Sequence, residues 1–297
     1  MRGLFVNFAD TLIARTREFG PLCVGIDPHA GRIPALFGGD TPQGIAAWGM
    51  AVVDACAGKV AIVKPQVGLF ERHGPEGMAA LQAVMERAKA QDMLVLADAK
   101  RGDIGSTAEG YAAAYLAEDA PFPADCVTVN PYMGLDTLEP FLSAAEASGK
   151  GVAVLVRTSN PGSADFQAKA IGERSLWSEV GHALSPAITR LRGQGAWSSL
   201  MFVAGATGPE EARALRDIAP SALFLVPGYG AQGADAAAAL AGFVPGPDGL
   251  EGGVVNASRS ITFPAAAQSA DTYAAWQDAI AHALDAASAD LRAAAQG

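Results

Sequence analysis

Charged side chains follow several short apolar runs of this sequence, and their spacing could serve acid–base chemistry. Asp27 ends one run, Lys64 lies in the next, and a third continues into Asp98-Ala-Lys100-Arg-Gly-Asp103. Asp98 and Lys100 are two residues apart, so on a strand their side chains leave the same face, and Lys64 on a neighbouring strand can approach them. Burying such charges costs several kcal/mol per ion unless each is paired. A structural ion-pair network is the alternative, but several charged strand ends meeting at one place favour a functional site.

A second polar group, later in the chain, could bind a phosphate. The segment Pro227-Gly-Tyr-Gly-Ala-Gln232-Gly has glycines at 228 and 230, which let backbone N–H groups approach an anion. Gln232 can donate from its amide, and Arg259, at the end of the next apolar run, offers a bidentate guanidinium. Simple tight turns are the alternative for the glycines alone. With Arg259 at the next strand end, phosphate binding is the better interpretation.

Eight short apolar runs must position these side chains. Continuous runs rich in Val, Ile, Leu and Cys suit strands that are buried on both faces, as in a parallel sheet. We expect strands at 21–27, 60–65, 93–100, 126–131, 151–158, 200–207, 222–228 and 253–258. The Ala-rich segments between them predict helices at 41–57, 75–91, 106–118, 135–148, 173–193, 209–218 and 231–240, with a terminal helix at 271–295.

This alternation predicts a (β/α)8 barrel (TIM barrel), in which side chains at the carboxyl ends of the strands form the active site. An additional N-terminal helix, at about 7–18, could cover the bottom of the barrel. We predict a single barrel domain over 1–297. An open doubly wound sheet is the alternative, but no GxGxxG follows the first strand and the number of strands reaches eight.

Composition limits the partners. The 297 residues include 21 Lys or Arg and 31 Asp or Glu, and the net charge of −10 argues against a nucleic-acid-binding surface. The histidines and cysteines show no metal-ligand spacing, and Ser159 has no evident His–Asp pair, so we expect neither a metal site nor a hydrolase triad. No apolar run is long enough to cross a membrane and no signal peptide is evident. We therefore expect a cytoplasmic protein.

The third apolar run and the residues after it resemble the orotidine 5′-phosphate decarboxylases. LVLADAKRGDIGST (94–107) contains the D-x-K-x-x-D-[IV]-x-x-T pattern of that family. Further likeness lies in VGIDP, IVKP and PGYGAQG, and the segments NPYMG, RTSNPG and NASRS are most similar to its longer bacterial branch, type 2. The resemblance implies a (β/α)8 barrel that forms a homodimer with shared active sites. It also implies conversion of orotidine 5′-phosphate to UMP and CO2 in de novo pyrimidine biosynthesis, without a cofactor.

Carried onto the matching positions, the resemblance implies a role for each candidate residue. Lys100 would protonate C6 of the pyrimidine, Asp98 would lie beside the departing carboxylate, and Lys64 would order the charges and contact the ribose. Further contacts would come from Asp27 to a ribose hydroxyl, Ser159 and Pro227 to the pyrimidine, Gln232 and Arg259 to the phosphate, and from Asp103, Ile104 and Thr107 into the partner subunit's site.

Two departures from the family pattern and several rival functions remain. Ser258 stands where many members have glycine, which leaves open how closely its backbone approaches a phosphate. The segment of about 40 residues between the fifth and sixth runs is longer than in compact members and has no implied role. Related barrels use D-x-K-x-x-D for Mg²⁺-dependent enediolate chemistry, but they carry a carboxylate where this chain has Lys64. A Schiff-base aldolase and a non-enzymatic barrel are further alternatives.

Overall fold

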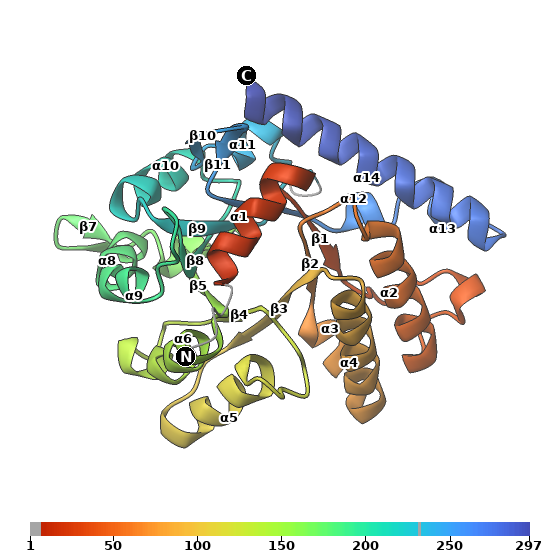
Figure 1. The fold of residues 1–297 in the computed structure, drawn as a ribbon, viewed down its shortest axis with the longest axis horizontal. Helices are drawn as coiled ribbons and strands as arrows, with labels where there is room; N and C mark the ends of the chain where they lie inside the picture. The colour runs from red at the N-terminus through yellow and green to blue at the C-terminus, as the bar shows by residue number, and fades with distance from the viewer. Residues whose placement is uncertain (1–6, 231–232) are drawn as a thin grey trace.

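The computed structural model describes residues 7–230 and 233–297, in which the eight expected strands close into a parallel barrel (Figure 1). Around the barrel the strands are ordered β1, β12, β9, β8, β5, β4, β3 and β2. Their bounds are β1 Leu22–Ile26, β2 Ile62–Pro65, β3 Leu94–Arg101, β4 Cys126–Val129, β5 Gly151–Arg157, β8 Ser198–Ala204, β9 Ala222–Val226 and β12 Gly253–Ala257. The predicted (β/α)8 architecture is therefore confirmed.

The helices surround the barrel (Figure 1). The longer ones are α2 Pro42–Cys56, α4 Gly74–Ala90, α5 Gly105–Leu116, α6 Glu139–Ser148, α8 Leu176–Ala183, α10 Pro209–Ile218 and α14 Tyr273–Gln296. The shorter ones are η1 Ala35–Phe37, α3 Val67–Glu71, η2 Leu135–Leu138, α7 Ser163–Phe166, α9 Ser185–Arg190, α11 Ala236–Ala239, α12 Arg259–Thr262 and α13 Ala265–Gln268. No helix in the described part of the chain is long and apolar enough to span a membrane.

Two hydrophobic layers hold the barrel together. In the outer layer, strand residues such as Val24 and Val63 belong to one cluster with helix residues such as Trp48, which is fully buried. The inner layer fills the barrel and includes Cys23 and Met201. Because both faces of each strand are covered, the strands read as continuous apolar runs.

The N-terminal helix α1 (Phe8–Phe19) closes the bottom of the barrel, as the sequence predicts. Asn7 caps it by accepting hydrogen bonds from the first backbone N–H groups. Phe8 and Leu12 join the inner hydrophobic layer. At the start of β5, Gly151 leaves room for Phe8, since a Cβ there would lie 2.5 Å from the Phe8 ring. The carboxyl ends of the strands, on the opposite side, remain available for a site.

Two predicted helices are shorter than expected. In the segment 173–193 the helix starts late, because β7 (Arg174–Ser175) pairs with β6 (Ala170–Ile171), and it is then divided into α8 and α9 at Leu184. Within 231–240 the structure has only α11, which starts after its cap Asp235, and 231–232 lie outside the described residues. A second hairpin, β10 (Val244–Gly246) with β11 (Gly249–Glu251), has no counterpart in the sequence prediction.

Candidate active site

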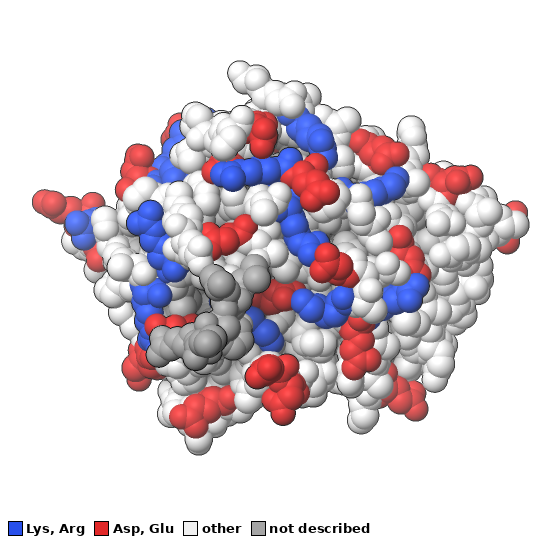
Figure 2. Space-filling model, viewed as in Figure 1, with Lys and Arg blue, Asp and Glu red and all other residues white. Residues whose placement is uncertain are grey.

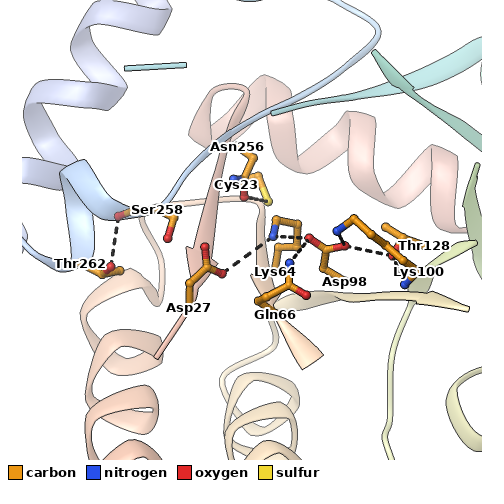
Figure 3. A network of polar contacts seen from close by, with 10 residues as sticks. All are labelled: Cys23, Asp27, Lys64, Gln66, Asp98, Lys100, Thr128, Asn256, Ser258 and Thr262. Atoms are coloured by element: carbon orange, nitrogen blue, oxygen red, sulfur yellow. Dashed lines mark hydrogen bonds and ion pairs between the residues drawn. The ribbon is translucent and has the colours of Figure 1, made fainter. Parts of the chain in front are cut away.

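The charged residues at the ends of the first three strands meet at the open end of the barrel (Figure 3). Lys64 on β2 donates to Asp98 Oδ2 at 2.9 Å, and Lys100 on β3 donates to Asp98 Oδ1 at 2.5 Å. Asp27, directly after β1, places Oδ1 at 4.0 Å from Lys64 Nζ. Carboxylates and ammonium groups thus alternate in the order Asp27, Lys64, Asp98, Lys100, which we call the charged row.

Burial differs along the charged row. The side chains of Lys64 and Asp98 are 5% and 9% exposed, whereas that of Lys100 is 47% exposed. Burial alone would raise the pKa of Asp98, but the charges of Lys64 and Lys100 outweigh it and hold that pKa well below its usual range. Burial would likewise lower the pKa of Lys64, but the carboxylates of Asp98 and Asp27 raise it instead. Asp98 and Lys64 are therefore ionised at neutral pH.

A cavity of about 510 Å³ lies over the charged row. Leu155, Val203 and Leu225 form an apolar part of its wall. A cavity with an apolar wall and a few convergent polar groups is typical of a small-molecule site. It brings together six of the predicted site residues: Asp27, Lys64, Asp98, Lys100, Ser159 and Pro227.

Four other predicted site residues that the structure describes, Asp103, Ile104, Thr107 and Arg259, do not line this cavity on their own chain. Arg259 is exposed at the start of α12, just beyond β12. Asp103, Ile104 and Thr107 lie between β3 and the first turn of α5, where Ile104 is 62% exposed. Gln232 lies outside the described residues.

Six polar residues that line the cavity were not among the predicted site residues: Gln66, Thr128, Thr158, Asn160, Gln167 and Asn256. Gln66 donates to Asp98 Oδ2 at 2.8 Å and Thr128 donates to Oδ1 at 3.1 Å. With the two lysines, Asp98 therefore accepts four hydrogen bonds. Gln66 could have been found from its spacing, since it lies two residues after Lys64. Asn256 is a polar residue within the last strand, which is a weaker signal.

Ser258, the departure from the family pattern, packs against β1. A Cβ added to Gly25 would lie 2.7 Å from the Ser258 Cβ, so glycine at position 25 makes room for this side chain. The Ser258 hydroxyl is buried and has no hydrogen-bond partner among the described residues.

The described side chains that could bind a metal ion lie apart from one another. Within 7–230 and 233–297, no three His, Cys, Asp or Glu side chains are grouped closely enough to hold a metal ion. The three cysteines are buried as free thiols, and burial raises the pKa of Cys23 to about 12. These thiols are core residues and unreactive at neutral pH.

Known proteins share both the sequence and the fold. A family model described as the orotidine 5′-phosphate decarboxylase / HUMPS family matches residues 20–273. The chain is 41% identical to the orotidine 5′-phosphate decarboxylase of Verminephrobacter eiseniae, over 88% of this chain and 91% of that one. It is 39% identical to that of Leptothrix cholodnii, over 97% and 100%. The OMP decarboxylase structure from Leishmania donovani matches with a TM-score of 0.78 and 30% identity, covering 97% of this chain and 99% of that one. The chain therefore belongs to the orotidine 5′-phosphate decarboxylase / HUMPS family.

Proposed function

We propose that this protein converts orotidine 5′-phosphate to UMP and CO2 in pyrimidine biosynthesis, with the chemistry taking place over the charged row. The family match and the names of relatives 41% and 39% identical to the chain support this reaction. The observation that carries the assignment of the site is the Asp98 carboxylate held between the ammonium groups of Lys64 and Lys100. Because substrate and product are biosynthetic nucleotides, we place the enzyme in the cytoplasm.

The charged row fits the central difficulty of this decarboxylation. Loss of CO2 breaks the bond between C6 and its carboxylate and leaves the electron pair on C6, where no adjacent carbonyl is positioned to accept it. A fixed ammonium can stabilise this charge as it develops and then transfer a proton to C6. Lys100, the more exposed lysine of the row, is that proton donor in our proposal. Its neutral amine regains a proton from solvent, and no metal, Schiff base or organic cofactor takes part.

Asp98 and Lys64 prepare Lys100 for this role. The Asp98 carboxylate holds the ammonium of Lys100 by a hydrogen bond of 2.5 Å and lies beside the departing carboxylate in our proposal. Lys64 pairs with the other oxygen of Asp98 and contacts the ribose. Because the charges of Lys64 and Lys100 lower the pKa of Asp98, its negative charge persists at neutral pH and stays beside the Lys100 ammonium.

In our proposal the substrate is bound by the cavity wall and by residues that follow β9 and β12 in the chain. Asp27 Oδ1 is buried without a hydrogen-bond partner among the described residues, which supports a contact to a ribose hydroxyl. Ser159 and Pro227 line the cavity where the pyrimidine would lie. We assign the phosphate to Arg259 and Gln232, and binding of this remote group can contribute to the chemical step.

We further propose a homodimer in which Asp103, Ile104 and Thr107 enter the partner subunit's site. On their own chain these three residues do not line the cavity. The segments beyond β3 and β4 also expose large apolar side chains, with Ile104 62%, Tyr132 84% and Met133 47% exposed. Apolar surface of this kind is typical of an interface.

An absorbance assay with orotidine 5′-phosphate in excess EDTA tests the reaction. We expect turnover that EDTA leaves unchanged. No turnover, or turnover that requires added Mg²⁺, would contradict the proposal and favour the Mg²⁺-dependent barrels. Against that alternative, Lys64 places an ammonium 2.9 Å from Asp98, and an ammonium is a poor neighbour for Mg²⁺, which is bound by oxygen ligands.

A further inference from the structure

Lys100 has a backbone conformation that residues other than glycine rarely adopt. Its φ is +48°, and among the described non-glycine residues only Asp92, with φ +55°, shares this left-handed region. Such conformations persist where the surrounding structure enforces them, and they gather at functional sites. The contacts that hold Lys100 in this conformation are therefore part of the site.

Irregular pairing between β3 and β4 surrounds Lys100. Ala97 pairs with Val127 and Arg101 pairs with Val129, so a step of four residues on β3 faces a step of two on β4. A bulge of this kind re-aims side chains. Thr128 lies between Val127 and Val129 on β4. Its Oγ1 accepts a hydrogen bond from the backbone N–H of Lys100 at 2.8 Å, in place of the backbone hydrogen bond that a regular ladder would supply.

The same hydroxyl also contacts the carboxylate of Asp98. Thr128 Oγ1 donates to Asp98 Oδ1 at 3.1 Å, and that oxygen also accepts Lys100 Nζ at 2.5 Å (Figure 3). A hydroxyl has one proton, so its oxygen can accept from the Lys100 backbone while the proton goes to Asp98. Thr128 is 1% exposed, which protects both hydrogen bonds from competition with water.

We propose that Thr128 is a positioning residue for the decarboxylation, because it holds the Lys100 backbone directly and the Lys100 ammonium through Asp98. This inference rests on the proposed role of Lys100 as the proton donor. Valine at position 128 would fill nearly the same volume but would leave the Lys100 N–H unpaired. Serine would keep the hydroxyl. The loss should fall on kcat, because the proton donor is displaced while the contacts that bind the ribose and phosphate remain.

Steady-state kinetics with orotidine 5′-phosphate test this role in Thr128→Val, Thr128→Ala and Thr128→Ser. The matched control is Thr137→Val, since Thr137 is equally buried and donates to Gly134 O outside the site. We expect Thr128→Val and Thr128→Ala to lower kcat on the order of 10- to 100-fold with KM within about threefold. Thr128→Ser and Thr137→Val should keep most of the wild-type kcat.

The outcomes separate this inference from the proposed function. If the wild-type protein does not decarboxylate orotidine 5′-phosphate, the proposed function fails. If the wild type is active and Thr128→Val keeps its kcat, only the role of Thr128 is wrong. The role of Thr128 is also overturned if Thr128→Ser loses as much kcat as Thr128→Val. It is overturned as well if the losses in kcat parallel the losses in melting temperature and Thr137→Val shows them too. Should Thr128→Val not fold, the smaller Thr128→Ala provides the same comparison with Thr128→Ser.

Discussion

Replacing Asp98 with asparagine tests whether the charged row is one electrostatic unit. The substitution keeps the shape of the side chain but removes the charge that Lys64 and Lys100 share. At an effective dielectric constant of about 20, the Lys64–Asp98 attraction at 2.9 Å is worth about 6 kcal/mol. The attraction between Lys64 and Asp27 at 4.0 Å is worth about 4 kcal/mol. Asparagine would therefore leave the buried Lys64 with the weaker of its two partners.

The net loss is smaller than the gross attraction, because burying the ions in the native state has its own cost. Removal of one partner from a buried pair costs about 3–5 kcal/mol, and we expect Asp98→Asn to lower the free energy of unfolding by about this amount. For a chain of this length that corresponds to a melting temperature lower by about 5–8 °C. Asp54→Asn is the matched control. It removes a carboxylate from a pair with Arg87 whose side chains are 32% and 43% exposed, and it should change stability little.

Urea unfolding at pH 7, followed by circular dichroism, measures these differences. The double variant Lys64→Met/Asp98→Asn completes a double-mutant cycle. Because it removes both buried charges, it should be more stable than the sum of the two single losses predicts. The reasoning is refuted if Asp98→Asn costs no more than Asp54→Asn, or if the two single losses simply add.

Removal of the ammonium of Lys100 and the guanidinium of Arg259 should affect different kinetic constants. Lys100→Ala should abolish nearly all turnover, whereas Arg259→Ala should chiefly raise KM, and equal losses in kcat alone would contradict these roles. Mixed Lys100→Ala and Asp103→Ala chains should regain part of the activity, and hybrid dimers that stay inactive would place Asp103 in its own chain's site. The fold lowers the pKa of Asp98, so this carboxylate contributes stability above its unfolded pKa of about 3.9, and the contribution is lost as pH falls through the native value. Wild-type stability should thus fall more steeply below about pH 4 than that of Asp98→Asn, and parallel curves would argue against the shift.

The charged row could be predicted from the sequence because of how a barrel is built. β1, β2 and β3 are neighbours in the barrel, so charged residues at their carboxyl ends come together once the strands are placed. The alternation of side chains along a regular strand, in contrast, does not fully explain the contact between Asp98 and Lys100. The strand is bulged at these residues and Lys100 has a φ of +48°. Hydrophobic periodicity describes regular strands and contains no information about a bulge.

Thr128 could not be recognised from the sequence for a related reason. Threonine is common in strands, so one threonine in the run 126–129 carries no mark of function. The hairpin that replaces the start of the expected helix at 173–193 did leave a signal, because Gly172 lies at its turn with a φ of +64°. A glycine followed by one polar residue is typical of a two-residue hairpin turn.

The net charge of −10 does not oppose an anionic nucleotide, because the field at the cavity is set locally. On the face shown in Figure 2, Lys and Arg are interspersed with Asp and Glu, and pairs such as Arg190 with Glu139 neutralise one another at 2.7 Å. The field of exposed charges decays over about 8 Å at physiological ionic strength, whereas buried charges are screened much less. The charged row itself is neutral in sum, since it pairs two carboxylates with two ammonium groups. In our proposal the phosphate is held by Arg259 and Gln232, so the local placement of these donors, and not the net charge of the chain, allows an anionic substrate.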